Sequence, residues 1–121
     1  MRFIFAFLLI FAVVFTPEIQ AATTEEINIP ALVESIYIAE GGAKAKKPFG
    51  ILSVPCNGYD ECKKICSNTV RNNLIRWDKA GRPGEFIEFL ADRYCPPSVD
   101  LRGNINWKRN VKSIYARKNH R

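Results

Sequence analysis

Histidine is almost absent from this sequence, since the single copy, His120, lies in the C-terminal tail. A Ser-His-acid or Cys-His nucleophile would have to use this residue, at a place where a base is poorly held. Phosphate-binding P-loops, dinucleotide-binding glycine motifs and paired-histidine metalloprotease motifs are also missing. The sequence therefore argues against these classes of enzyme, and we expect no cofactor and no metal ion.

Long apolar runs are also lacking, because none reaches the roughly 20 residues that a membrane-spanning helix requires. The longest, residues 3–15, follows the positive start Met1-Arg2 and precedes a small-residue cleavage region that ends at Ala21. This pattern predicts a signal peptide over residues 1–21, with a retained membrane anchor as the alternative. We expect a secreted or periplasmic protein in which residues 22–121 form one domain without an integral membrane span.

Cysteine is sparse, but the four copies fit two disulfides in a small exported protein. Cys62 and Cys66 are four residues apart in a helical pattern, a spacing poorly suited to a bridge between them. We favour Cys56–Cys62 with Cys66–Cys95, and the second choice is Cys56–Cys66 with Cys62–Cys95. A zinc site is the alternative, although the spacings differ from the usual paired short knuckles.

Acidic residues are outnumbered, with 18 Lys and Arg against 12 Asp and Glu, which gives a formal net charge of +6. In an exported protein this excess favours an anionic partner such as a cell-wall polymer or the envelope surface. Solubility alone is the alternative. No motif beyond the charge supports binding to nucleic acid, so we expect none.

Apolar residues recur at helical spacing in four segments, which together predict a small, mostly α domain. The predicted helices cover residues 29–40, 60–79, 85–94 and 107–118. Residues 49–54 are expected as a short strand or an extended turn, and residues 98–106 as a turn-rich loop. The last helix is basic and amphipathic, which suits either a membrane or wall surface or an ordinary solvated face.

Glu40, at the end of the first predicted helix, is the best-placed candidate for catalysis. It follows Ile36 by one turn and Val33 by two, so its side chain points to the apolar side. Desolvation and the negative end of the helix both disfavour the carboxylate, and we expect them to outweigh the lysines of the next loop. A glutamate that stays protonated near neutral pH suits a general acid. The alternative is that Glu40 only satisfies backbone groups at a helix end.

Two motifs resemble the lysozyme-like superfamily. The first is an Ala-Glu-Gly step at a helix end, followed about ten residues later by Gly-Ile-Leu-Ser, within "YIAEGGAKAKKPFGILS" (residues 37–53). The second, "FLADRYCPPSVDLRGNINWKRNV" (residues 89–111), is similar to a segment that borders the sugar site of secreted wall hydrolases. The chain looks closest to goose-lysozyme-related lytic transglycosylases and to Glu-Gly-Gly muramidases, although the usual Ala-Tyr-Asn segment of the transglycosylases is not apparent.

The resemblance implies a small lysozyme-like helical domain that cleaves peptidoglycan glycan strands, with Glu40 as the general acid. It implies a substrate-binding role for Ser53 and Tyr94, and we add Asn73 from the inward stripe of the second helix. Each of these three has a structural alternative: a turn cap, a core aromatic or a bond to a neighbouring loop. The implied sugar-site loop also contains Asn104 and Asn106.

Ordinary glycosidases use two carboxylates, whereas a lytic transglycosylase works with one glutamate as acid and then base. Asp60, Glu61, Asp92 and Asp100 are available as a second acid, but no motif places them in the site. Asp100 is the best of the four, although an Asp in such a turn is usually structural. The sequence therefore favours the single-glutamate route. The alternative function is a non-catalytic wall-binding or accessory module on the same scaffold.

Overall fold

The structure is a computed structural model that describes residues 26–119, and within this range it is mostly helical and has no strand. Its elements are α1 (Ile29–Ala39), the 3₁₀ turns η1 (Gly42–Lys44) and η2 (Pro48–Gly50), α2 (Gly58–Lys79), α3 (Phe86–Tyr94) and α4 (Leu101–Asn119). The predicted mostly α class is confirmed. No helix among the described residues is both long and apolar enough to cross a membrane. The expected signal peptide lies outside the described residues.

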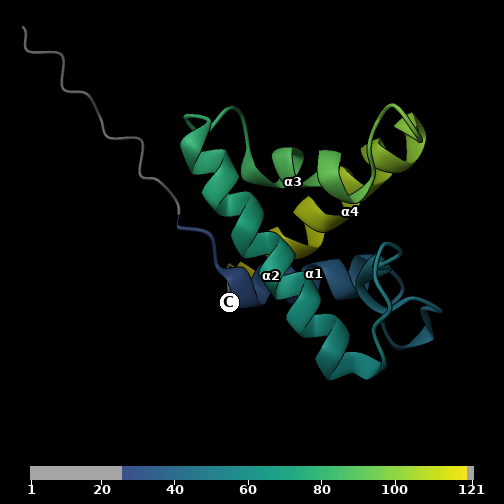
Figure 1. Cartoon of the computed structure of the whole chain (residues 1–121). Helices are drawn as coiled ribbons and strands as arrows, with labels where there is room; N and C mark the ends of the chain where they lie inside the picture. The colour runs from purple at the N-terminus through teal and green to yellow at the C-terminus, as the bar shows by residue number, and fades with distance from the viewer. Residues whose placement is uncertain (1–25, 120–121) are drawn as a thin grey trace, which may run out of the picture.

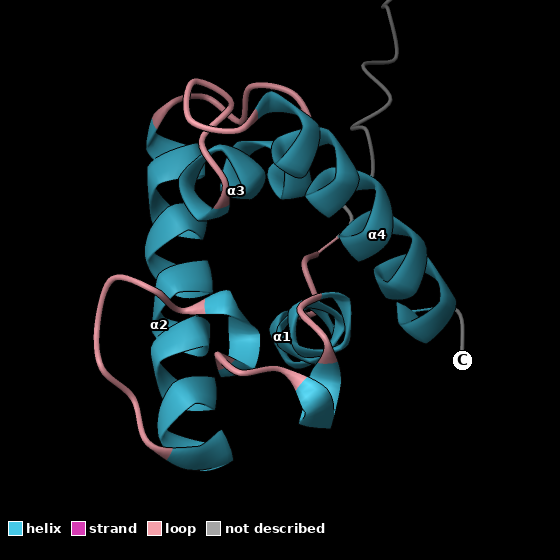
Figure 2. Cartoon of the chain, turned by 90° about the vertical axis from the view of Figure 1, so that its right-hand side faces the viewer, coloured by secondary structure: helices cyan, strands magenta, loops and turns pink. Residues whose placement is uncertain are grey.

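Each of the four α-helices packs against two of the others, so that the contacts between them form a closed ring. α1 packs against both α2 and α4, while α3 contacts the same two helices at another level (Figure 1). In Figure 2, α1 is seen nearly end-on between α2 and α4, with α3 across the top. This arrangement covers α1 on two sides, as its run of apolar residues requires.

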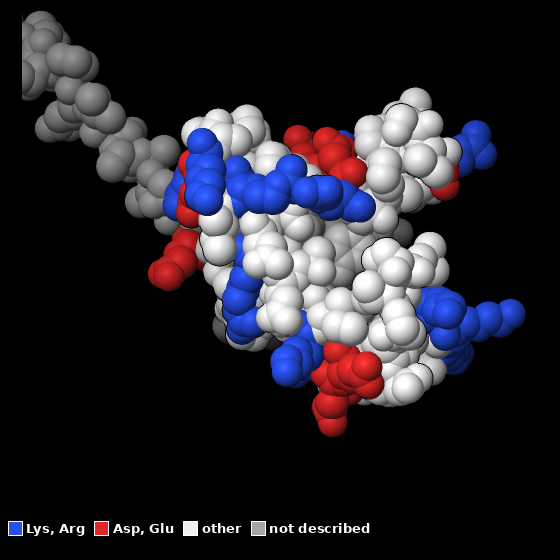
Figure 3. All heavy atoms as spheres, in the orientation of Figure 1, with Lys and Arg blue, Asp and Glu red and all other residues white. Residues whose placement is uncertain are grey.

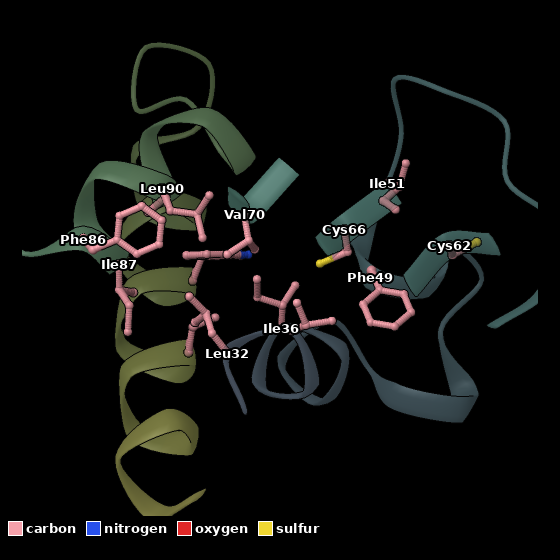
Figure 4. Close-up of a cluster of buried hydrophobic side chains, with 14 residues drawn as sticks. Leu32, Ile36, Phe49, Ile51, Cys62, Cys66, Val70, Phe86, Ile87 and Leu90 are labelled. Atoms are coloured by element: carbon pink, nitrogen blue, oxygen red, sulfur yellow. The ribbon is translucent and has the colours of Figure 1, made fainter. Parts of the chain in front are cut away.

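The core is formed where the apolar faces of all four helices meet the η2 turn. Figure 4 shows Leu32 and Ile36 of α1 pointing toward Val70 of α2 and Leu90 of α3, with Phe49 of η2 at the other end of the cluster. These five side chains are fully buried. Burial of each such side chain contributes roughly 1.5–3 kcal/mol, so the core fixes both α1 and the η2 turn.

Both ends of α1 follow the local sequence signals. Asn28 Oδ1 accepts a hydrogen bond from the Ala31 N–H at 3.0 Å, with Pro30 in the first turn. At the other end, the Glu40 N–H donates to the Ile36 carbonyl at 3.0 Å, and Gly41 takes a left-handed conformation at φ 107°. The predicted helix end at Glu40 is therefore confirmed, with Glu40 as its capping residue.

The last helix begins earlier than predicted. Residues 98–106 were expected to form a loop, but α4 starts at Leu101. Asp100 explains this start, because its Oδ1 accepts from the Gly103 N–H at 2.9 Å and its carbonyl from the Asn104 N–H at 3.0 Å. This cap, together with the buried side chain of Asn104, outweighs the low helix propensity of glycine and asparagine in the first turns.

Replacing the cap tests this explanation. We expect Asp100→Ala to lower the free energy of unfolding by about 1 kcal/mol, because the Gly103 N–H loses its partner. Asp100→Asn keeps a capping oxygen and should retain most of the stability. Urea unfolding followed by circular dichroism measures both variants, and equal losses in the two would contradict a capping role.

The second predicted disulfide is not formed. Cys56 and Cys62 are bridged, as favoured, but Cys66 and Cys95 are free thiols, and the second-choice pairing is also absent among the described residues. The physical reason is their orientation. Cys66 is buried in the core and accepts a hydrogen bond from the Tyr94 hydroxyl, whereas Cys95 faces the Asp100 carbonyl at the start of α4.

Candidate functional site

Glu40 is held by a residue from the other end of the chain. Its Oε1 accepts a hydrogen bond from the indole Nε1–H of Trp107 on α4, at 2.8 Å. Trp107 is 7% exposed and stacks on Tyr94 of α3, with ring centroids 5.1 Å apart and an interplanar angle of 25°. The indole is thereby fixed between two helices, and it orients the carboxyl of Glu40.

Gly50 closes in on the same carboxyl. A Cβ built on Gly50 would lie 2.5 Å from Glu40 Cδ and 2.7 Å from each carboxyl oxygen, so no side chain fits there. Gly50 also has φ +66°, which glycine adopts without steric cost. The carboxyl group therefore lies directly against a backbone that only glycine can provide.

Phe49, the residue before Gly50, holds the backbone of Gly50 in place. Phe49 has a left-handed conformation at φ 61°, which is unfavourable for a residue with a bulky side chain. Its ring is fully buried and packs against Tyr37 and Tyr59, with centroids 5.0 and 5.6 Å away. Backbone strain of about 1–3 kcal/mol is thus offset by burial of an aromatic ring, which anchors Gly50 against Glu40.

The environment of Glu40 favours its protonated form. Burial raises the pKa of its carboxyl, and the hydrogen bond from Trp107 lowers it in part. The net direction is upward, because the loss of hydration outweighs one neutral donor. Glu40 as a residue is half-buried.

Tyr94 and Cys66 form a neutral pair beside the carboxyl. The Tyr94 hydroxyl donates to Cys66 Sγ at 3.0 Å. Burial raises the pKa of the Cys66 thiol to about 11, and burial, with the Cys66 thiol next, also raises the pKa of the Tyr94 hydroxyl. Both groups therefore stay protonated at neutral pH, which leaves Glu40 as the group of this cluster suited to exchange a proton.

A surface cavity of about 180 Å³ adjoins the cluster. Its lining residues come from the loop after α1, from α2 and from the end of α3: Gly50, Ile51, Leu52, Ser53, Ile65, Thr69, Arg93 and Tyr94. Figure 3 shows the surface hollowed between the lobe over the α3–α4 connection and the lobe over the loops that follow α1. Gly50 is common to the cavity wall and the carboxyl contact, so the acid lies behind this wall.

Only part of the predicted site residues meet at this cavity. Ser53 is exposed and lines it, and Tyr94 lines it from the end of α3. Residues 49–54, expected as a strand or an extended turn, supply this wall through the η2 turn and an irregular segment.

The three predicted asparagines lie elsewhere. Asn73 is buried in α2, where its amide nitrogen donates to the Thr69 carbonyl at 2.8 Å. The Asn104 amide donates to Asp92 Oδ1 and to the Cys95 carbonyl, at 3.0 and 2.8 Å, and so joins α4 to α3. Asn106 is exposed in a separate groove on α4. The structure thus brings Ser53 and Tyr94 to the cavity, and uses the first two asparagines for internal bonds.

The candidate second acids do not line the cavity. Asp60 and Glu61 lie in the exposed first turn of α2, and Asp100 caps α4. Asp92 accepts from Asn104 and pairs with Lys108 at 3.5 Å. Glu40 does not line the cavity either, but it adjoins the cavity through the lining residue Gly50, whose built Cβ would lie 2.5 Å from Glu40 Cδ.

Sequence reasoning did not assign three residues of this site. Helical spacing predicts only that Trp107 lies on the apolar face of the last helix, and its role as a donor to Glu40 depends on a contact across 67 positions. Arg93 and Thr69 also line the cavity. The sequence contains one signal for Arg93, because this residue directly precedes Tyr94, a predicted substrate-binding residue.

Trp107→Phe tests the role of the indole. This change keeps an aromatic ring but removes the N–H, whose bond lowers the pKa of Glu40. We therefore expect the Glu40 pKa to rise further, measured by ¹³C NMR titration of its carboxyl carbon. Trp77→Phe is the matched control, since the Trp77 indole donates instead to the Pro83 carbonyl. A Glu40 pKa that is unchanged or lower in the Trp107 variant would contradict the account.

No protein-family model matches the chain, and no significant match appears among curated proteins or solved structures.

Proposed function

We propose that this chain is a lysozyme-like enzyme that cleaves the β-1,4 bond between N-acetylmuramic acid and N-acetylglucosamine in peptidoglycan. The observation that carries the proposal is the partly buried carboxyl of Glu40, fixed by Trp107 and pressed against Gly50 behind the wall of a cavity. A carboxyl group with a raised pKa suits protonation of a glycosidic oxygen. The resemblance of residues 37–53 and 89–111 to lytic transglycosylases and muramidases supports the same assignment.

A single-glutamate mechanism fits the acids around the cavity. Glu40 donates its proton to the glycosidic oxygen, the bond to C1 of N-acetylmuramic acid breaks, and positive charge develops on the sugar ring. The 6-hydroxyl of the same sugar then attacks C1 and returns its proton to the Glu40 carboxylate. The products are a free 4-hydroxyl on one side and a 1,6-anhydro end on the other, and no water is consumed. Inverting and retaining hydrolases need a second carboxylate. Glu40 adjoins the cavity through Gly50, whereas Asp60, Glu61, Asp92 and Asp100 do not line it.

The surface charge suits a polyanionic wall. Lys and Arg side chains are spread over much of the face shown in Figure 3, in keeping with the net charge of +6. Such a field raises the local concentration of the protein on anionic polymer. The Cys56–Cys62 disulfide fits an oxidising space outside the cytoplasm, and we extend the proposal to an exported protein.

The size of the cavity favours one other candidate, a wall-binding accessory module without activity. At about 180 Å³ it is smaller than the roughly 300–1,000 Å³ typical of a small-molecule site. A cavity of this size fits one sugar ring or side group of a polymer, and the other units of the polymer would lie on the surface outside it.

Digestion of purified peptidoglycan separates the two functions. The enzyme should release soluble muropeptides, detected by chromatography and mass spectrometry. The accessory module would sediment with the polymer but release nothing, even at high protein concentration. Release of muropeptides by the protein supports the proposed function, and binding without release would replace it with the second candidate.

A further inference from the structure

Arg93 is the charged side chain of the cavity. The other lining residues are glycine, aliphatic residues and the hydroxyl-bearing Ser53, Thr69 and Tyr94. Arg93 lies at the end of α3, directly before Tyr94, whose ring stacks on the indole that holds Glu40. Arg93 therefore lines the same small cavity as Gly50, the residue that contacts the carboxyl of Glu40.

The guanidinium of Arg93 has no carboxylate within 4.0 Å among the described residues. The acids of α3 and of its N-cap are paired with α4: Asp92 with Lys108, and both Glu85 and Glu88 with Lys112. Acids are thus available on α3, but they are engaged with cations of α4. The planar guanidinium fork, with its five donors, matches a carboxylate in two parallel hydrogen bonds.

We propose that Arg93 binds a carboxylate of the substrate, so that the cavity selects anionic glycans over neutral ones. This inference rests on the proposed function, because it concerns the glycan that Glu40 would cleave. In peptidoglycan the carboxylate comes from the lactyl ether of N-acetylmuramic acid or, where that group is linked to peptide, from the peptide. The uncharged part of the sugar unit that carries the carboxylate would contact the apolar side chains of Ile51 and Leu52. A chitin chain lacks such carboxylates and gains nothing from Arg93.

Binding to three soluble probes tests the inference, with Glu40→Gln protein so that no probe is cleaved. The probes are a peptide-free tetrasaccharide of alternating N-acetylglucosamine and N-acetylmuramic acid, the same tetrasaccharide with its peptides, and chitotetraose. We expect Arg93→Gln to weaken binding of at least one carboxylate-bearing probe about tenfold. Chitotetraose should bind with unchanged affinity, and Arg93→Lys should restore part of the loss. Isothermal titration calorimetry measures all affinities.

Arg71→Gln is the matched control, because it removes the same charge from the protein. Arg71 is exposed on α2, two residues after Thr69, and that spacing turns it away from the cavity side of the helix. A loss confined to the peptide-free probe assigns the lactyl carboxylate, and a loss confined to the peptide-bearing probe assigns the peptide; either supports the inference. Equal effects of the Arg93 and Arg71 changes, or equal losses on all three probes, would overturn it and leave the proposed function standing. Binding of none of the probes by the parent protein would overturn both.

Discussion

Glu40→Gln is expected to reduce the rate of muropeptide release from peptidoglycan by about 10²–10⁴-fold. Glutamine has the size of glutamate and keeps an oxygen for the Trp107 indole, but it cannot transfer a proton. The loss should therefore fall on the chemical step, with binding to the polymer retained. Quantitative chromatography of the soluble fragments measures the rate, and sedimentation with the polymer measures the binding.

Thermal unfolding separates this loss from misfolding. Because burial raises the pKa of Glu40, its ionised form destabilises the folded state at neutral pH, and the stability that the protonated group supplies is lost as pH rises through its folded pKa. Glutamine stays neutral, so the variant should unfold at the same temperature as the parent or higher at pH 7. Undiminished activity of a well-folded Glu40→Gln protein would falsify the assignment of the acid.

Gly50→Ala is expected to lower the activity about 100-fold, the scale of loss that a displacement near 1 Å causes in an active site. The added Cβ would lie 2.5 Å from Glu40 Cδ. Either the carboxyl must shift away from the indole of Trp107, or the η2 backbone must shift, and both displace the acid relative to the cavity wall. The rate of muropeptide release measures the effect.

Gly81→Ala provides the control for backbone strain. Gly81 also has a positive φ, +85°, but a Cβ there would meet no atom within 4 Å. Both variants carry the cost of about 1–2 kcal/mol for a left-handed alanine, and only the Gly50 change crowds Glu40. We expect similar losses of thermal stability from the strain alone, with the loss of activity confined to Gly50→Ala. Equal activities in the two variants would show that the contact between Gly50 and Glu40 has no role in the reaction.

The parts of the site that were predictable depend on local signals. Asn28 and Pro30 mark the start of α1 and Gly41 its end, so the position of Glu40 at an apolar helix end follows from nearby residues. Tyr94 reaches the cavity at the end of α3, a helix that the sequence outlines, and Ser53 reaches it from the irregular segment after η2. The Cys56–Cys62 bridge is also local, since the two residues are six positions apart.

The remaining parts depend on contacts between distant segments. Trp107 and Glu40 meet only once α4 has packed on α1, and helical spacing alone places Trp107 in the core without naming its partner. The early start of α4 depends on the buried amide of Asn104, whose partners belong to α3 and its end. The free thiol of Cys66 likewise reflects its burial beside Tyr94, which no spacing between cysteines reveals.

The chemical identity of the product ends tests the central claim most directly. Purified peptidoglycan is digested with the protein in water enriched in ¹⁸O, and the fragments are analysed by mass spectrometry. Single-glutamate transfer predicts 1,6-anhydro ends, each lighter than a reducing end by one water and free of ¹⁸O. Reducing ends that carry ¹⁸O would contradict the transfer mechanism, and the absence of soluble fragments would contradict the enzyme.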